Sequence, residues 1–518
     1  MTQKLSIHRA YRGKHILLTG ASGFLGKVWL SLMLDRVPEI EKIYVLIRRK
    51  RDLGAWERFE EIVATSYAFE PLHRRHGGTL GAYLGSRVEV VEGDVSLPDF
   101  GIEACVAEEL FRKLDLIVHC AGLVDFEPDL REAVATNISG AVHAVNFAKR
   151  CRQAALVHVS TCYVVGELRE GLAPETLLPD YTPNGKAMSA EGEYAELLDF
   201  VKTASLKDSE WVEEARRRAA NYGWPNGYTY SKSLAESLIR NRAGDLKYSV
   251  VRPAVVESSM HYPFPGWNEG AQTCAPLSYL LGTWLRFFPI NTRHVLDVIP
   301  VDYVCHAVTV AGAALMEGCP SQVIQVGSSQ RNPLRLDRML ELLNLAHRAH
   351  WRQSASPLER IFLSRWDSVA VSQDSPLGPE NLRKTAAGIF EALRGLKERS
   401  PKGVHEYLNR ILSSVNKAKW ALVKTEKVVE VFAPFIYRTD FRFVTEALAK
   451  YEVEESEFAS LPEDIDWRHY VLKVLEPGLR RWCYPVLEGK PVEKLRAPEG
   501  FCIPREGRAG LRIAGRGR

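Results

Sequence analysis

The chain has 518 residues, of which 46% are hydrophobic and 25% are charged, and this balance predicts an ordinary globular protein of two or three domains. Its net charge of +4 is too small to indicate a nucleic-acid partner. The nine cysteines are irregularly spaced without a Cys-x-x-Cys pair, which argues against a disulfide framework and a metal site and favours the cytoplasm. No apolar run reaches the ~20 residues that span a bilayer, although residues 277–290 leave a peripheral membrane contact open.

Short apolar runs alternate with helix-length amphipathic stretches through the first third of the chain. This alternation is typical of β-α-β units, and the nearly continuous aliphatic character of the runs suits strands covered on both faces. We therefore predict an α/β fold with a Rossmann-type doubly wound parallel sheet and a smaller substrate subdomain. The predicted strands are 15–19, 42–47, 88–92, 116–120, 156–160, 248–252 and 323–326.

The first predicted strand runs directly into a glycine-rich turn. Residues 19–26 read Thr-Gly-Ala-Ser-Gly-Phe-Leu-Gly, which is a G-x-x-G-x-x-G pattern between a strand and a helix. A bound pyrophosphate needs a tight turn, a close approach of the backbone and the free N–H groups of a helix start. We therefore predict a dinucleotide site formed by Gly20, Ser22, Gly23, Phe24, Leu25 and Gly26.

The end of the second predicted strand is expected to select the cofactor. An NAD enzyme usually has an acidic residue there, which holds the ribose 2′-hydroxyl. This chain instead has Arg-Arg-Lys-Arg at positions 48–51, whose cations can bind a 2′-phosphate, so we predict NADPH and contacts from Arg48 and Lys50. Three further contacts, at the ends of the third and fourth strands, are expected from Asp94, Val95 and Ala121.

Tyr228 and Lys232 have the Tyr-x-x-x-Lys spacing that places two side chains on one helix face. The nearby ammonium is expected to lower the pKa of the Tyr228 phenol towards the range useful for general acid catalysis. A hydroxyl at the end of the fifth strand, from Thr161 or Ser160, can hydrogen-bond the substrate oxygen beside Tyr228, and we favour Thr161. Tyr230 is expected to point elsewhere.

Two regions depart from the strand–helix alternation. Residues 168–223 are polar, contain three prolines and end in a charged helix-like segment, so they are expected to be an insertion, either a lid or tunnel wall or a surface excursion without a role. After about residue 332 no further strands are predicted, and apolar residues recur at helical spacing. We therefore expect a catalytic domain over 1–330, a mostly helical domain over 331–500, and a basic, disordered tail over 501–518.

These motifs, in this order, resemble those of the extended short-chain dehydrogenases/reductases and, within that group, the fatty acyl-CoA reductases, also called male-sterility proteins. Over roughly residues 14–329 the resemblance rests on the motifs above, on Val-Arg-Pro at 251–253, Trp-Pro-Asn at 224–226 and Asp-Val-Ile-Pro-Val-Asp at 297–302. Asn137 matches the family's helix asparagine, and stretches at 432–435, 440–443 and 465–470 match its helical domain. Residues 265–270 depart from the usual pattern, which is expected to concern acyl-chain preference and not the cofactor pocket.

The resemblance implies reduction of long-chain fatty acyl-CoA to the alcohol by two hydride transfers from NADPH through an aldehyde. Thr161 and Tyr228 would stabilise the oxyanion, Lys232 would also bind the nicotinamide ribose, and Pro253 would line the cofactor. The carrier (CoA or acyl-carrier protein), release of the aldehyde and the oligomeric state remain open. Three rival interpretations fit less well. A sugar-nucleotide epimerase or dehydratase would retain NAD, against which the basic residues at 48–50 argue. The long insertion and the helical C-terminal domain fit a sterol or flavonoid dehydrogenase less well. A non-catalytic NADP(H) sensor often lacks the catalytic tyrosine or lysine, whereas this chain has both Tyr228 and Lys232.

Overall fold

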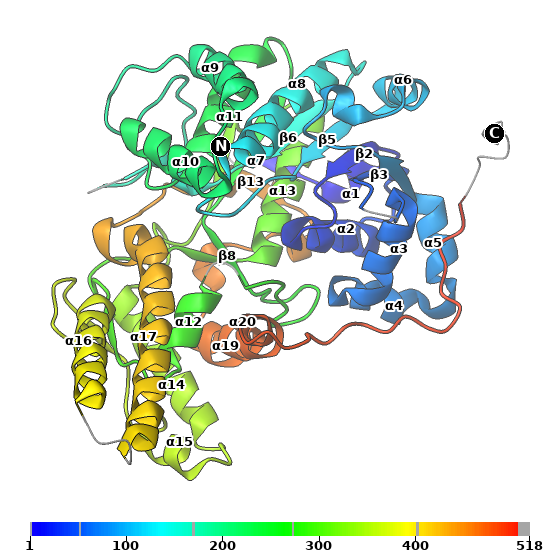
Figure 1. Ribbon diagram of the computed structural model, residues 1–518. Helices are drawn as coiled ribbons and strands as arrows, with labels where there is room; N and C mark the ends of the chain where they lie inside the picture. Colours follow the sequence, from blue (N-terminus) through cyan, green and yellow to red (C-terminus); the bar gives the residue numbers. More distant parts are fainter. Residues whose placement is uncertain (1–2, 51–52, 168–170, 272–273, 400–403, 506–518) are drawn as a thin grey trace, which may run out of the picture.

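The computed structural model describes residues 3–50, 53–167, 171–271, 274–399 and 404–505 (Figure 1). Its centre is a seven-stranded parallel sheet with the order β11-β7-β6-β5-β2-β3-β4. The order reverses beside β2, where a crevice for a ligand forms at the carboxyl ends of the strands. The predicted strands all occur, within two residues: β2 (His15–Thr19), β3 (Lys42–Ile47), β4 (Val88–Glu92), β5 (Leu116–His119), β6 (Ala155–Val159), β7 (Tyr248–Pro253) and β11 (Val323–Val326).

Helices cover both faces of this sheet because successive side chains of each strand point to opposite faces. Ile16 and Leu18 pack in one core with α2 (Phe24–Arg36) and α13 (Val301–Met316). Leu17, between them, packs in the other core with α6 (Ala104–Lys113), α8 (Gly140–Arg150) and α11 (Gly227–Ala243). The chain therefore has the predicted doubly wound α/β architecture.

The predicted insertion contains two helices, α9 (Ala190–Thr203) and α10 (Asp208–Tyr222), and the charged helix expected near its end is confirmed as part of α10. Both helices pack on α11 through an apolar cluster that includes Leu197, Trp211 and Leu234. A buried arginine, Arg218, ties them together by donating to Glu193 and Glu214. Residues 168–170 of the insertion lie outside the described residues.

The C-terminal region is mostly helical, with α14 (Leu336–Trp351), α16 (Pro379–Glu398) and α17 (His405–Ala433) as its longest helices. The expectation of no strands after residue 332 is wrong at two short ones, β12 (Val369–Val371) and β13 (Tyr451–Val453). Each has three residues and a partner distant in sequence; β13, for example, pairs with β1 (Gln3–Leu5). C-terminal aromatic residues also share one core with α2 and α13.

After α20 (Tyr484–Leu487) the chain runs back along α3 (Ala55–Thr65), α4 (Glu70–His76) and α5 (Leu80–Arg87) (Figure 1). The backbone N–H of Ile503 donates to Glu60 at 2.6 Å, and the Phe501 ring lies against His73. Residues 501–505 are therefore packed and not disordered, because two apolar side chains interrupt the basic tail. Residues 506–518 lie outside the described residues. No helix in the described ranges is both long and apolar enough to cross a bilayer.

Candidate active site

The glycine turn between β2 and α2 has the shape of a cradle in which backbone atoms pack against each other. Gly20 has φ +79°, and a Cβ added there would lie 2.7 Å from the backbone N of Ala121. A Cβ added to Gly26 would overlap the carbonyl oxygen of Gly20. At Gly23, by contrast, an added Cβ would meet only an ordinary contact at 3.4 Å. The described residues around Gly23 therefore leave its backbone open to the close approach of a bound group.

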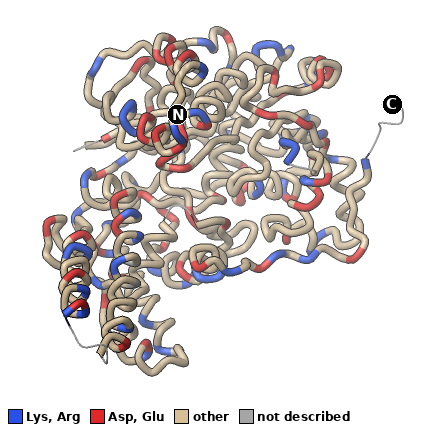
Figure 2. The backbone as a smooth tube through the Cα atoms, viewed as in Figure 1, with Lys and Arg blue, Asp and Glu red and all other residues tan. Residues whose placement is uncertain are grey.

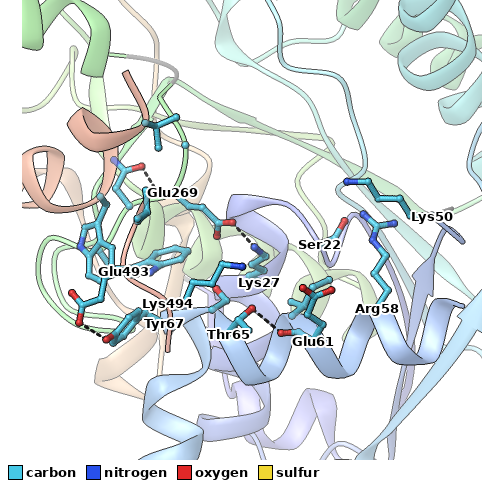
Figure 3. A pocket seen from close by; sticks show the side chains of 18 of the residues that line it. Ser22, Lys27, Lys50, Arg58, Glu61, Thr65, Tyr67, Glu269, Glu493 and Lys494 are labelled. Atoms are coloured by element: carbon cyan, nitrogen blue, oxygen red, sulfur yellow. Dashed lines mark hydrogen bonds and ion pairs between the residues drawn. The ribbon is translucent and has the colours of Figure 1, made fainter. Parts of the chain in front are cut away.

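Basic side chains surround one end of a cavity of about 690 Å³ next to this turn. Ser22, Lys50 and Arg58 line that end (Figure 3). Arg58 lies in the first turn of α3 and donates from Nη1 to the backbone oxygen of Arg48 at 2.9 Å. Burial and the charge of Arg48 lower the pKa of Arg58. Sequence analysis missed Arg58, although its place at the start of the helix after the basic loop could have indicated it.

The predicted Arg48 and Lys50 are both exposed at the end of β3, whereas Arg51 lies outside the described residues. An Arg48 guanidinium nitrogen lies 3.6 Å from a carboxylate oxygen of Asp94. The other Asp94 oxygen accepts from the backbone N–H of Ser96 at 2.9 Å, which orients the carboxylate at the end of β4. These charged groups therefore lie together at the carboxyl edge of the sheet.

The loop at 265–270 lies against the glycine turn. The rings of Trp267 and Phe24 stack with centroids 5.1 Å apart. The buried ammonium of Lys27, on α2, lies 2.5 Å from a Glu269 carboxylate oxygen (Figure 3). Trp267, Asn268 and Glu269 line the same cavity as Ser22. The expectation that this departure leaves the cofactor pocket unaffected is therefore wrong, because tertiary folding brings the loop onto the turn.

The other predicted cofactor residues lie at or near the same edge. Ala121 donates its backbone N–H to Thr19 Oγ1, and the Pro253 carbonyl lies 3.4 Å from Thr161 Oγ1. The Leu25 side chain is half-buried at the start of α2. The Val95 side chain is buried against Gly140, and the Val95 carbonyl accepts a hydrogen bond from His143. Both of these contacts are with residues of α8.

The Trp-Pro-Asn motif positions the start of α11. Asn226 caps the helix, since its side-chain oxygen accepts from the backbone N–H of Thr229 at 2.9 Å. Trp224 donates its indole N–H to the carbonyl of Val164 at 2.9 Å, which ties the motif to the segment after β6. Together these contacts place Tyr228 next to the end of β6.

The three predicted catalytic side chains lie together at this point. The Thr161 hydroxyl lies close enough to the Tyr228 phenol to lower its pKa against the effect of burial. Lys232 is buried and donates from Nζ to the carbonyl of Val159 at 3.0 Å. A Cβ added to Gly122 would lie 2.9 Å from that Nζ and 3.3 Å from Asn137 Oδ1, so a small residue is needed there for Lys232.

The neighbouring hydroxyl groups behave as the sequence analysis favoured. Tyr230 points away from the cluster and donates its hydroxyl to Glu193 at 2.5 Å, which confirms its exclusion. The buried Ser160 hydroxyl has no hydrogen-bond partner among the described residues. The contact with Tyr228 comes from Thr161. Asn137 donates to Ser231 Oγ at 2.9 Å, next to Lys232 in the helix.

The electrostatics differ from the expectation in one respect. Burial raises the pKa of Tyr228 to about 12, and the hydrogen bond with Thr161 opposes this only in part. The predicted lowering of that pKa by Lys232 is therefore wrong for this structure, because the ammonium is directed at the carbonyl of Val159. Burial lowers the pKa of Lys232 itself to about 8.

Aromatic side chains from the C-terminal region pack against Phe126 and Tyr163, which lie next to the predicted catalytic residues. Phe126 lies edge-on to Tyr228, with ring centroids 6.0 Å apart, and 5.2 Å from Phe435. Tyr163, two residues after Thr161, contacts three rings at 4.9 to 5.3 Å: Phe435, Phe441 and Phe443. Sequence analysis matched these stretches to a family but assigned them no place, and the tertiary structure brings them to the site.

Comparison with known proteins identifies a family and several similar proteins. The family model described as "Male sterility protein" matches residues 18–308, more than half of the chain. The alcohol-forming fatty acyl-CoA reductase of Simmondsia chinensis is 28% identical over 507 residues, which cover 92% of this chain and 99% of that protein. The chloroplastic fatty acyl-CoA reductase 2 of Arabidopsis thaliana is 28% identical over 528 residues, covering 95% and 81%. A solved terminal R domain from the myxalamid PKS-NRPS biosynthetic pathway has a TM-score of 0.46 and 21% identity, covering 73% of this chain and 85% of that one. The chain belongs to the male sterility protein family, as its motifs predicted.

Proposed function

We propose that this protein is an NADPH-dependent fatty acyl-CoA reductase that forms a long-chain alcohol in two successive reductions, through an aldehyde. The observation that carries the proposal is the placement of Tyr228, Thr161 and Lys232 together at the carboxyl edge of a sheet whose glycine turn has the shape of a dinucleotide site. The apolar wall of Phe126 and Phe435 beside Tyr228 suits an acyl chain. The relative from Simmondsia chinensis, which is named alcohol-forming, supports the same product.

The choice of NADPH rests on the cations beside the turn. Burial first and then the charge of Arg48 lower the pKa of Arg58, and an anion bound between the two guanidinium groups would relieve their repulsion. We assign the cofactor 2′-phosphate to Ser22, Lys50 and Arg58, with Arg48 next to them, and the pyrophosphate to the turn around Gly23. When bound, the cofactor supplies the hydride.

The residues of the site then act on the substrate oxygen. With a pKa near 12 the Tyr228 hydroxyl stays protonated at neutral pH, so it can donate a hydrogen bond together with Thr161. Both hydroxyls stabilise the negative charge that develops on the thioester oxygen, and collapse of the resulting oxyanion expels the CoA thiolate and leaves the aldehyde. In the second reduction Tyr228 gives its Oη proton to the alkoxide. Lys232 would hold the nicotinamide ribose.

The test follows NADPH absorbance with palmitoyl-CoA, together with release of CoA thiol and chromatography of the lipid product. Two NADPH consumed per thiol released, with hexadecanol as product, are expected. Tyr228→Phe removes the proton donor and should lower kcat by about 10²–10⁴-fold. Tyr407→Phe, which changes an exposed tyrosine of α17, is the matched control and should leave kcat unchanged.

Two outcomes would contradict parts of this proposal. One NADPH per thiol with accumulating aldehyde would overturn alcohol formation and keep the reductase. No consumption with any acyl-CoA length would overturn the reductase itself.

A further inference from the structure

Exposed apolar side chains gather around α15 (Pro357–Phe362), at the opposite end of the molecule from α9 and α11 in Figure 1. Trp366 is 63% exposed, Leu358 62% and Trp284 57%. The surface is continuous, because the Phe362 ring lies 6.2 Å from that of Trp284 and 5.7 Å from that of Trp366. We call this surface the α15 patch; it consists of Trp284, Leu358, Ile361, Phe362, Trp366 and Val369.

The residues of the α15 patch are not part of the hydrophobic core of the protein. Scattered exposed apolar residues are normal on a protein surface, whereas a contiguous group of large ones marks a surface that meets another apolar phase. None of the residues of α15, all of which the structure describes, is buried. The apolar segment at 277–290, where the sequence left a membrane contact open, is different. Its helix α12 (Ala275–Leu281) and Phe288 lie in the core, while Trp284 belongs to the patch.

The charges around the α15 patch are mainly positive. Arg352, Arg360 and Arg365 are exposed within a short stretch of chain. Figure 2 shows where basic residues, in blue, lie along the chain at this end of the molecule. The two acidic residues of this stretch already have partners: Glu359 accepts from Ser354 Oγ at 2.6 Å, and Asp367 lies 3.3 Å from an Arg348 nitrogen. Residues 352–369 thus hold three arginines and two carboxylates, of which one pairs with Arg348, so an anionic surface facing the patch would meet an excess of positive charge.

We propose that the α15 patch docks this protein on the surface of an anionic lipid bilayer. Tryptophan and phenylalanine rings favour the boundary between headgroups and acyl chains, and Leu358 and Ile361 would insert beside them. The three arginines would contact lipid phosphates. The inference goes beyond the proposed function and depends only on the residues of this surface. A reductase bound to a membrane would also meet long-chain lipids, because these lipids partition into the bilayer.

The test is flotation of the full-length protein with vesicles, without substrate or cofactor. Vesicles of phosphatidylcholine with about 30% phosphatidylglycerol should carry the protein, and pure phosphatidylcholine vesicles should carry much less of it. The double variant Leu358→Ser/Trp366→Ser should lower binding to anionic vesicles by about tenfold or more, because it removes the two most exposed patch side chains. Leu172→Ser/Leu178→Ser, which changes two exposed leucines elsewhere, is the matched control and should bind like the parent.

Three results would overturn the proposal. The parent protein could fail to float with anionic vesicles, or the patch variant could float as well as the control. The parent could also be a dimer that the patch variant converts to a monomer, which would assign the surface to a second copy of the chain. Equal binding to neutral and anionic vesicles would overturn the role of the arginines.

Discussion

Lys232 provides a prediction that couples stability to the chemistry of the site. Burial lowers its pKa from 10.5 to about 8. The folded chain therefore binds this proton more weakly than the unfolded chain does, so stability rises with pH between about 8 and 10.5. At ~1.36 kcal/mol per pH unit, the difference corresponds to a destabilisation of about 3 kcal/mol near pH 7, which falls to about half of that near pH 9.5. Lys232→Met has no proton to bind and loses this dependence.

The comparison needs the free energy of unfolding of parent and variant at both pH values, from urea titrations followed by tryptophan fluorescence without cofactor. The stability of the parent relative to Lys232→Met should improve by about 2 kcal/mol from about pH 7 to about pH 9.5. Loss of the hydrogen bond to Val159 costs the variant about 1 kcal/mol at either pH, so it cancels in this comparison.

Lys202→Met, at an exposed position on α9, is the matched control and should differ from the parent by the same amount at both pH values. A gap between the parent and Lys232→Met that does not change with pH, or that changes in the opposite direction, would refute the argument that burial destabilises the charged Lys232. The variant should also lose reductase activity, since the proposed site uses the ammonium to hold the cofactor ribose.

Three further predictions concern the cofactor site and the insertion. Arg58→Ala should lower the preference in kcat/KM for NADPH over NADH by roughly 10–100-fold. Arg74→Ala, at an exposed position, is the control and should keep the preference of the parent. An equal loss of kcat/KM with both cofactors would contradict a contact between Arg58 and the 2′-phosphate. Gly26→Ala should abolish NADPH binding in a fluorescence titration, because its Cβ overlaps the backbone, whereas Gly395→Ala, which has open space, should bind normally. Arg218→Met removes the only cation that the structure pairs with buried Glu193 among the described residues and should lower the free energy of unfolding by about 3–5 kcal/mol. A loss under about 1 kcal/mol would show that the buried ion pair is not needed.

The sheet and the catalytic helix could be predicted because their patterns are local. Buried parallel strands are short aliphatic runs, and seven such runs were enough to predict the seven strands of the central sheet. The turn around Gly20 and the pair Tyr228 and Lys232 are recognisable for the same reason, since their spacing within one turn or helix decides their geometry.

Features that depend on contacts between distant segments required the tertiary structure. Arg58 faces Ser22 only once α3 folds beside the glycine turn, and Phe435 reaches Phe126 from a segment more than 300 residues away. The pKa of Tyr228 followed the same rule: the spacing to Lys232 predicted a lower value, but burial by distant residues raises it to about 12. The sequence by itself thus determined the strands, the dinucleotide turn and the catalytic helix, because hydrogen bonds and side-chain periodicity within a segment specify them. Only the tertiary structure decided which cations, rings and buried surfaces surround that site, because packing energy depends on which segments meet.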